Sequence, residues 1–300
     1  MAVESASVSV SDLELHSESL DVQRAAAIYN EHGALVVRGL SKAHVEPLRR
    51  EMEQMLEQAV SLLPQAVPVE RHAASWATPD GASFNEDPNH PGRKVVNGLK
   101  FNAMTSGTFL QALLNPKLLD VVEAIVGPDI ELWKWGQCIY RQPDSGVPKS
   151  LHQDEFYFEH KHQSTVGVLS YATDVDIQNS PLMVVPGSHK LGLIDHVNDQ
   201  WAGFALEDQS WWDRAIPITG QAGDAIFFCG AMIHGSPANR SDRPRPVFIQ
   251  RYRRADDFCI IDVANVADRA NAAAHPIPNK TDEDWGLMVR GLRRYLPPED

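Results

Sequence analysis

The feature that most constrains this chain is a change of texture near residue 131. From there on, short runs of β-branched and aromatic residues alternate with clusters of Gly, Pro and Asp. The runs are ELWKWGQCIYR (131–141), TVGVLSYATDV (165–175), PLMVVPGSH (181–189), GDAIFFCGAMIHGS (223–236) and RPVFIQRYRR (245–254). Runs of this length, bounded by turn residues, are typical of strands. Several in succession predict a mainly β protein, built as an antiparallel sandwich or barrel with flanking helices.

Helices are predicted mainly in the first third of the chain. Residues 1–20 are rich in Ser and Glu and predict a flexible tail, which leaves residues 21–300 as a single domain. Its predicted elements before residue 131 are a short helix at 21–30, a strand at 34–39, a long amphipathic helix capped by Ser41, and a helix between Asn115 and Gly127. The segment 63–107 has no clear period, and its length favours a functional loop.

Two potential metal ligands lie two residues apart in the stretch SLHQDEFYF, residues 150–158. If the stretch is a strand, His152 and Asp154 project from the same face. An H-x-D triplet also occurs by chance, and the two side chains could merely form a hydrogen-bonded pair. The pair could supply two ligands of a metal site, but a metal site is predicted only if other ligands join it.

A third ligand and an anion-binding residue come from later runs. His234 ends an apolar run 80 residues beyond Asp154, and a two-sheet jelly roll can bring it across the core to meet the pair. Two imidazoles and one carboxylate form the facial triad of non-haem Fe(II) oxygenases, which leaves three positions open. Arg245 begins the next run, where its guanidinium could clamp a carboxylate with two hydrogen bonds.

Composition excludes several other classes of function. The net charge of −13 opposes binding to a phosphate backbone, so a small-molecule substrate is expected rather than a nucleic acid. No apolar run approaches the length of a membrane span, and the acidic start lacks the features of a signal peptide, so we expect a cytoplasmic protein. The 3 cysteines have no C-x-x-C spacing, and they predict neither a disulfide framework nor a thiolate zinc site.

Taken together, these motifs resemble the phytanoyl-CoA dioxygenase family of Fe(II)/2-oxoglutarate oxygenases. The resemblance rests on His152-Gln153-Asp154, on PLMVVPGSHK (181–190) and on HGSPANRSDRPR (234–245), and it covers roughly residues 20–260. It implies a double-stranded β-helix core of the jelly-roll, cupin-like type at roughly 131–260, behind an α-helical N-terminal third. It also implies Fe(II) as the metal, with 2-oxoglutarate and dioxygen as cosubstrates.

The resemblance assigns roles to five residues. His152, Asp154 and His234 would hold the iron, Arg245 would hold the distal carboxylate of 2-oxoglutarate, and Ser236 would help to hold it. The retained Asp154 favours hydroxylation over halogenation, because halogenating relatives replace this ligand by a small residue. Two departures from the family pattern lie near the pocket: Leu151 stands where a tryptophan is frequent, and Asn179-Ser180 replaces the usual Asn-Gly.

The sequence leaves several alternatives open. A cupin-like metal-binding protein without oxygenase activity would use the same three ligands, although it would have no use for Arg245. An acyl-CoA hydroxylase is a further alternative, which the acidic balance disfavours because CoA phosphates favour a basic cluster. The tryptophan-rich segment 198–213 is either a lid or a packed excursion over a sheet edge, and a homo-oligomer is compatible with the chain.

Overall fold

Two largely antiparallel sheets form the body of the protein in a computed structural model. The structure describes residues 8–70, 72–79, 81–101, 106–133, 136–201, 203–261, 269–278, 280 and 284–293. The large sheet contains, in spatial order, β1 (Glu14–His16), β2 (Ala34–Arg38), β16 (Ala225–Cys229), β11 (Val166–Tyr171), β18 (Arg245–Arg254), β8 (Gly136–Arg141), β6 (Lys94–Phe101), β5 (Ala82–Glu86), β4 (Ser75–Ala77) and β3 (Val67–Pro68), while β7 (Ile130–Leu132) pairs with β18 and with β20 (Leu287–Arg290). The smaller sheet contains β15 (Ile216–Ile218), β12 (Leu182–Val184), β17 (His234–Ser236) and β9 (Lys149–His152). Two separate pairs are β10 (Glu159–His160) with β19 (Cys259–Ile261), and β13 (His196–Asn198) with β14 (Phe204–Leu206).

The chain alternates between the two sheets. It passes from β8 to β9, from β11 to β12, from β15 to β16 and from β17 to β18, each time leaving one sheet for the other. This connectivity is that of a jelly roll, in which strands distant in sequence become neighbours. The predicted β core is therefore confirmed, and the space between the sheets is where its inward side chains meet.

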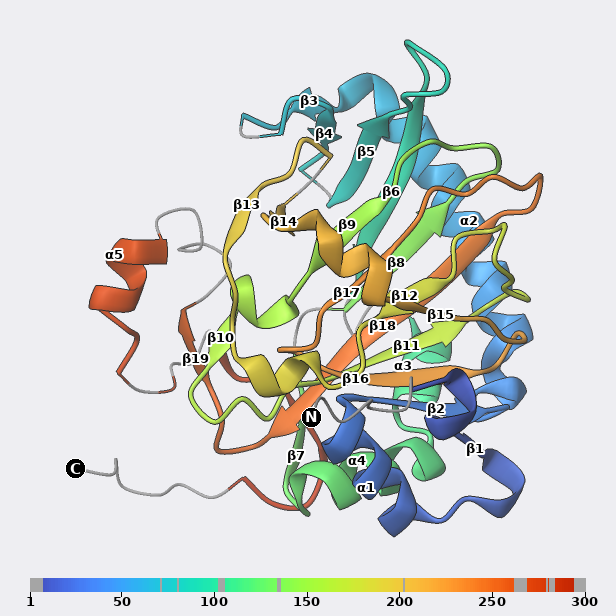
Figure 1. Cartoon of the computed structure of the whole chain (residues 1–300). Coiled ribbons are helices and arrows are strands. Elements are labelled where there is room, and N and C mark those ends of the chain that lie inside the picture. The colour runs from blue at the N-terminus through green and yellow to red at the C-terminus, as the bar shows by residue number, and fades with distance from the viewer. Residues whose placement is uncertain are drawn as a thin grey trace, which may run out of the picture.

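Helices cover one side of the large sheet (Figure 1). They are α1 (Val22–His32), α2 (Val45–Leu62), α3 (Gly107–Leu113) and α4 (Pro116–Val126), and a short α5 (Arg269–Ala274) lies apart from them. Short 3-10 helices are η1 (Val10–Asp12), η2 (Ser17–Ser19), η3 (Lys42–His44), η4 (Leu63–Gln65), η5 (Asp154–Phe156), η6 (Ser188–Leu191) and η7 (Gln209–Arg214). Among the described helices, none combines the length and the hydrophobicity that crossing a bilayer would require.

Local signals set most of the helix ends. The Asp21 side chain accepts hydrogen bonds from two backbone amides of the first turn of α1, and Gly33 ends that helix in the left-handed region at φ 75°. The Asn115 side chain caps α4 as predicted, by accepting from the amide of Lys117. The predicted cap at Ser41 is wrong, because its side chain makes no capping bond and a 3-10 turn intervenes before α2 begins at Val45.

The predicted loop at 63–107 is wrong, because the segment contains four paired strands, β3 to β6. Each of these strands pairs with its neighbour, and β6 pairs with β8, so they extend the large sheet beyond the jelly roll. β3, β4 and β5 have only 2, 3 and 5 residues, too few to show a clear period in the sequence. The N-terminal third is therefore not wholly helical, since strands alternate with its helices.

The predicted flexible tail is wrong for residues 8–20, whereas residues 1–7 lie outside the described residues. β1 pairs in parallel with β2, and the preceding Leu13 is fully buried against the core. An ion pair at 2.7 Å joins Glu14 to Arg38 on the paired strand. A single buried leucine and one edge ladder thus anchor a segment whose composition alone suggests disorder.

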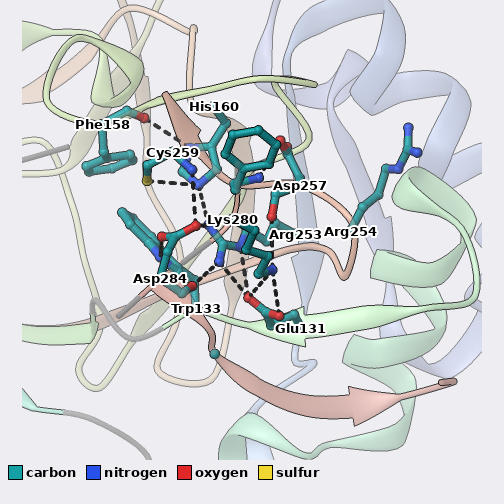
Figure 2. A network of polar contacts seen from close by, with 12 residues as sticks. Glu131, Trp133, Phe158, His160, Arg253, Arg254, Asp257, Cys259, Lys280 and Asp284 are labelled. Carbon is teal, nitrogen blue, oxygen red and sulfur yellow. Dashed lines mark hydrogen bonds and ion pairs between the residues drawn. The ribbon is translucent and has the colours of Figure 1, made fainter. Parts of the chain in front are cut away.

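A buried polar cluster attaches the C-terminal segment to the large sheet (Figure 2). Glu131 on β7 is fully buried and accepts hydrogen bonds from Arg253 at 2.6 Å, Lys280 at 2.9 Å and Arg293 at 2.5 Å. Arg253 also donates to the His160 ring at 2.9 Å. Two cations from the segment after residue 269 therefore converge on one carboxylate of the sheet.

Candidate metal centre

Three potential ligands converge at one end of the smaller sheet. His152 ends β9, His234 begins β17, and the two residues are register partners on these neighbouring strands. Asp154 lies beyond the end of β9, as the first residue of η5, and its carboxylate lies close to both imidazoles. The prediction that these three residues meet is confirmed. The route is different, because Asp154 is not on the strand and His234 reaches the pair from the adjacent strand rather than from across the core.

The geometry of the three side chains fits a single metal ion. His152 Nε2 lies 3.6 Å and His234 Nε2 lies 3.9 Å from Asp154 Oδ1, and all three potential ligand atoms lie within 4.8 Å of one another. All three side chains are buried. Three donor atoms this close together in a buried place can bind one metal ion, and they leave coordination positions open for further ligands.

Backbone carbonyls set the tautomer of both imidazoles. His152 Nδ1 lies 2.9 Å from the Ser150 carbonyl oxygen, and His234 Nδ1 lies 2.9 Å from that of Met232. Each Nδ1–H therefore donates to the backbone, which leaves the Nε2 lone pair directed at the centre. Burial lowers the pKa of both imidazoles below the usual range, so both rings are neutral near pH 7, as metal binding requires.

Arg251 is a residue of this site that the sequence analysis missed. Its Nε and Nη2 donate to Asp154 Oδ2 at 2.9 Å and 2.6 Å, so Oδ1 is the oxygen left for a metal. Burial opposes ionisation of Asp154, but the Arg251 guanidinium beside it holds the pKa of that carboxyl well below its usual range. Period-two alternation along β18 could have found it, because residues 245 and 251 share a face of that strand.

We expect Arg251→Gln to lower the affinity for Co(II) by about 10- to 100-fold, the usual cost of losing a partner that orients a metal ligand. Without the guanidinium, Asp154 loses the contact that directs Oδ1 at the two imidazoles. Isothermal titration calorimetry measures the effect, with Arg243→Gln as a control, since the Arg243 side chain is 49% exposed and pairs with Asp176 outside the cavity. Equal affinities in the two variants would show that Asp154 needs no such partner.

The three potential metal ligands lie in a cavity between the two sheets, with a volume of about 310 Å³. Its described lining includes residues of β8, β11, β16 and β18 from the large sheet, and of β9, β12 and β17 from the smaller sheet. Arg245 and Ser236 both line it. Gly203 and Tyr157 also border it, and the Tyr157 hydroxyl accepts a hydrogen bond from the Phe204 amide at 2.7 Å.

Arg245 and a second arginine, Arg141, occupy the same cavity. Arg245 is buried, donates to Ser180 Oγ at 3.2 Å, and leaves its Nε without a hydrogen-bond partner among the described residues. Arg141 was missed in the sequence, although it ends the first predicted β run. Its Nε lies 3.4 Å from Ser236 Oγ. Burial lowers the pKa of Arg245 to about 10, and burial together with Arg245 lowers that of Arg141 to about 9.

Comparison with known proteins places the chain in a family. Residues 29–247 match the model of the phytanoyl-CoA dioxygenase family (PhyH). The peroxisomal phytanoyl-CoA dioxygenase of Bos taurus is 29% identical over 224 residues, a match that covers 71% of this chain and 63% of that protein. A probable alpha-ketoglutarate-dependent hypophosphite dioxygenase of Stutzerimonas stutzeri is 27% identical over 59% of this chain and 62% of its own length.

Solved structures share the fold at lower sequence identity. The alpha ketoglutarate dependent epimerase SnoN from nogalamycin biosynthesis is 20% identical, with a TM-score of 0.59 over 92% of this chain and 98% of its own. This similarity supports the jelly-roll architecture seen in the two sheets. With a family model matched over most of its length and the H-x-D and His residues brought together, the chain belongs to the phytanoyl-CoA dioxygenase family of non-haem iron, 2-oxoglutarate-dependent oxygenases.

Proposed function

We propose that the protein uses Fe(II), 2-oxoglutarate and dioxygen to hydroxylate, or otherwise oxidise, an unactivated C–H bond of a small organic molecule. The observation that carries the proposal is the presence of three converging ligand atoms and a buried arginine in one cavity. In this reaction 2-oxoglutarate, dioxygen and the substrate give succinate, carbon dioxide and the hydroxylated product. The relatives named above bear different substrate names, so none of their substrates is carried over.

His152, His234 and Asp154 would hold the iron. The two neutral imidazoles would present Nε2 and the carboxylate Oδ1, while Arg251 occupies Oδ2. When bound, the iron supplies the activation of dioxygen that couples decarboxylation of 2-oxoglutarate to oxidation of the substrate. The side chains of this chain fix the geometry and keep the donor set at a net charge of −1.

Arg245 and Ser236 would hold the distal carboxylate of 2-oxoglutarate. Support comes from the burial of Arg245 and from its Nε, which has no hydrogen-bond partner among the described residues. A buried guanidinium with an unused donor is costly, and a carboxylate bound in two-pronged geometry would satisfy it. A cupin-like protein that only binds a metal would gain nothing from this arrangement.

Two alternatives differ from the proposal in testable ways. A metal-binding protein without oxygenase activity would bind Fe(II) but would not form a complex with 2-oxoglutarate. An acyl-CoA hydroxylase would form that complex and would turn over thioesters but not free acids. Asp154 is present as a carboxylate, which favours hydroxylation over halogenation.

Anaerobic addition of Fe(II) and 2-oxoglutarate tests the proposal directly. We expect a weak visible charge-transfer band, because the cosubstrate would chelate the iron through its C1 carboxylate and keto oxygen. Admission of oxygen should then release succinate slowly even without a primary substrate. If iron binds and no band forms at millimolar 2-oxoglutarate, the metal-binding alternative is correct.

Arg245→Lys is expected to weaken the binding of 2-oxoglutarate by about 10-fold or more, because the ammonium keeps the charge but not the two-pronged geometry. The measurement is the concentration of 2-oxoglutarate at half-maximal charge-transfer absorbance. Arg240→Lys serves as the control, since Arg240 is exposed in the turn before β18. An unchanged midpoint in Arg245→Lys would assign this arginine to the primary substrate instead.

The segment 203–213 is expected to become more protected from hydrogen exchange when Zn(II) and 2-oxoglutarate are added. Gly203 borders the cavity, and the Phe204 amide is bonded to Tyr157 beside it, so filling the cavity should stabilise the β13–β14 hairpin. Peptides from α4 serve as the internal control. Equal exchange in both states would make the segment a packing element, consistent with the contact of Trp211 and Trp212 with a small buried cluster.

A further inference from the structure

Arg141 is a buried cation whose described partners are all neutral. It lies at the end of β8 with 3% of its surface exposed, and it is the register partner of Arg245 on β18. Its hydrogen bonds go to Asn97 Oδ1 at 2.9 Å, to the Tyr140 carbonyl oxygen at 3.3 Å and to Ser236 Oγ at 3.4 Å. No described carboxylate forms an ion pair with this guanidinium.

The cavity around Arg141 has an excess of positive charge. Its described lining contains three buried arginines, Arg141, Arg245 and Arg251, and one carboxylate, Asp154, which is bonded to Arg251. Burying a guanidinium without a counter-charge costs several kcal/mol, so the fold retains Arg141 and Arg245 at the expense of stability. The excess stands against a net charge of −13 for the whole chain, so the cavity differs in sign from the protein that surrounds it.

The proposed cosubstrate accounts for only one of the two arginines. 2-Oxoglutarate has two carboxylates: one would chelate the iron with the keto group, and the other would lie on Arg245. The Arg141 guanidinium spans from this site toward β6: its Nε lies 3.4 Å from Ser236 Oγ, whereas its Nη1 bonds Asn97 on β6, on the far side of β8 from β18. Ser83, Asn97 and Gly98 extend the lining of the cavity in this direction.

We propose that Arg141 binds an anionic group of the primary substrate, so that the oxidised molecule is a small carboxylic acid or a comparable anion. The inference rests on the proposed function and adds the chemical class of its substrate. Asn97 holds the guanidinium in place, and Gln137, another lining residue of β8, faces the same space. With one end fixed at Arg141, a C–H bond elsewhere in the substrate is presented to the metal centre, as positioning by a charged clamp requires.

The volume of the cavity limits the size of this acid. About 310 Å³ must hold both 2-oxoglutarate and the reacting part of the substrate, near the lower end of the range for ligand sites. A neutral substrate of the same size would leave Arg141 buried without a counter-charge during turnover. An anion removes that cost, and charge therefore serves as the main determinant of specificity.

The first part of the test separates the roles of the two arginines. In the anaerobic Fe(II) protein, Arg245→Gln is expected to lower the affinity for 2-oxoglutarate by about 10-fold or more. The affinity of Arg141→Gln for 2-oxoglutarate should stay within about threefold of the wild-type value. Equal weakening in both variants would assign Arg141 to the cosubstrate and overturn the inference. Failure of the wild-type protein to form the charge-transfer band would instead refute the proposed function.

The second part uses probes of matched size and different charge. The protein with Zn(II) and saturating 2-oxoglutarate is titrated with acetate, benzoate or 3-phenylpropionate, and separately with the neutral amide of each acid. Ligand-observed NMR measures the binding. We expect at least one acid to bind about 10-fold more tightly than its amide, and Arg141→Gln to abolish the difference. Arg141→Lys keeps the charge and should keep part of the preference, which distinguishes loss of the cation from damage to the fold. No preference for any acid, or a preference that survives in Arg141→Gln, would overturn the inference.

Discussion

Replacing His152 or His234 by Ala is expected to lower 2-oxoglutarate turnover by more than about 100-fold while leaving the fold largely intact. Each change would remove one of three metal ligands, whereas the loss of a residue that only supports a ligand costs about 10- to 100-fold. Neither imidazole belongs to a hydrophobic cluster of the described residues. Each makes one backbone hydrogen bond, and the rings pack on aromatic neighbours, His152 on Tyr157 and His234 on Phe228. Succinate release measures the loss of turnover, and Co(II) binding measures the loss of the metal ligand.

His90→Ala is the matched control for these variants. The His90 side chain is 42% exposed and pairs with Asp144 at the surface, so its loss removes an imidazole without touching the cavity. A variant of His152 or His234 that kept more than about a tenth of the wild-type turnover would remove that residue from the ligand set. Circular dichroism of all three variants checks that the comparison concerns folded proteins.

Glu131→Gln is expected to lower the free energy of unfolding by about 3–5 kcal/mol, the usual cost of removing one partner from a buried ion pair. Gln has nearly the volume of Glu, so the loss comes from charge rather than from a cavity. Arg253 is fully buried beside it, and Lys280 reaches the same carboxylate from the C-terminal segment (Figure 2). Arg293 also forms an ion pair with Glu131. Urea unfolding followed by tryptophan fluorescence gives the measurement.

Glu53→Gln provides the comparison for Glu131→Gln. Glu53 forms an ion pair with Arg49 on the surface of α2, and its side chain is 55% exposed, so we expect a change of about 1 kcal/mol or less. A similar small change in Glu131→Gln would mean that the C-terminal segment does not depend on this cluster. The cluster also reaches the metal centre, because Arg253 faces Trp133, whose ring packs on Phe158 beneath Arg251.

Elements with a strong local signal could be predicted from the sequence. The strand after Gly33 and the helix between Asn115 and Gly127 are present close to the expected bounds, and each β run beyond residue 131 contains at least one strand. Segments with a weak period could not. β4 and β5 are short and half polar, and they are strands because each pairs with a neighbour in the sheet. The composition of residues 8–20 likewise suggests disorder, whereas the structure shows Leu13 buried and β1 paired with β2.

By itself, the sequence determined which chemical groups are available: an H-x-D pair, a later histidine and an arginine at the start of the last long strand. These are identities and spacings, and local periodicity is enough to place them on strands or turns. Only the tertiary structure decided that Arg251 directs Asp154 and that Arg141 lies beside Arg245. The first contact joins residues 97 positions apart, and the second depends on the register of β8 against β18. Such contacts arise because strand pairing brings charged residues that are distant in the sequence together in a buried place. No local pattern in the sequence reveals them.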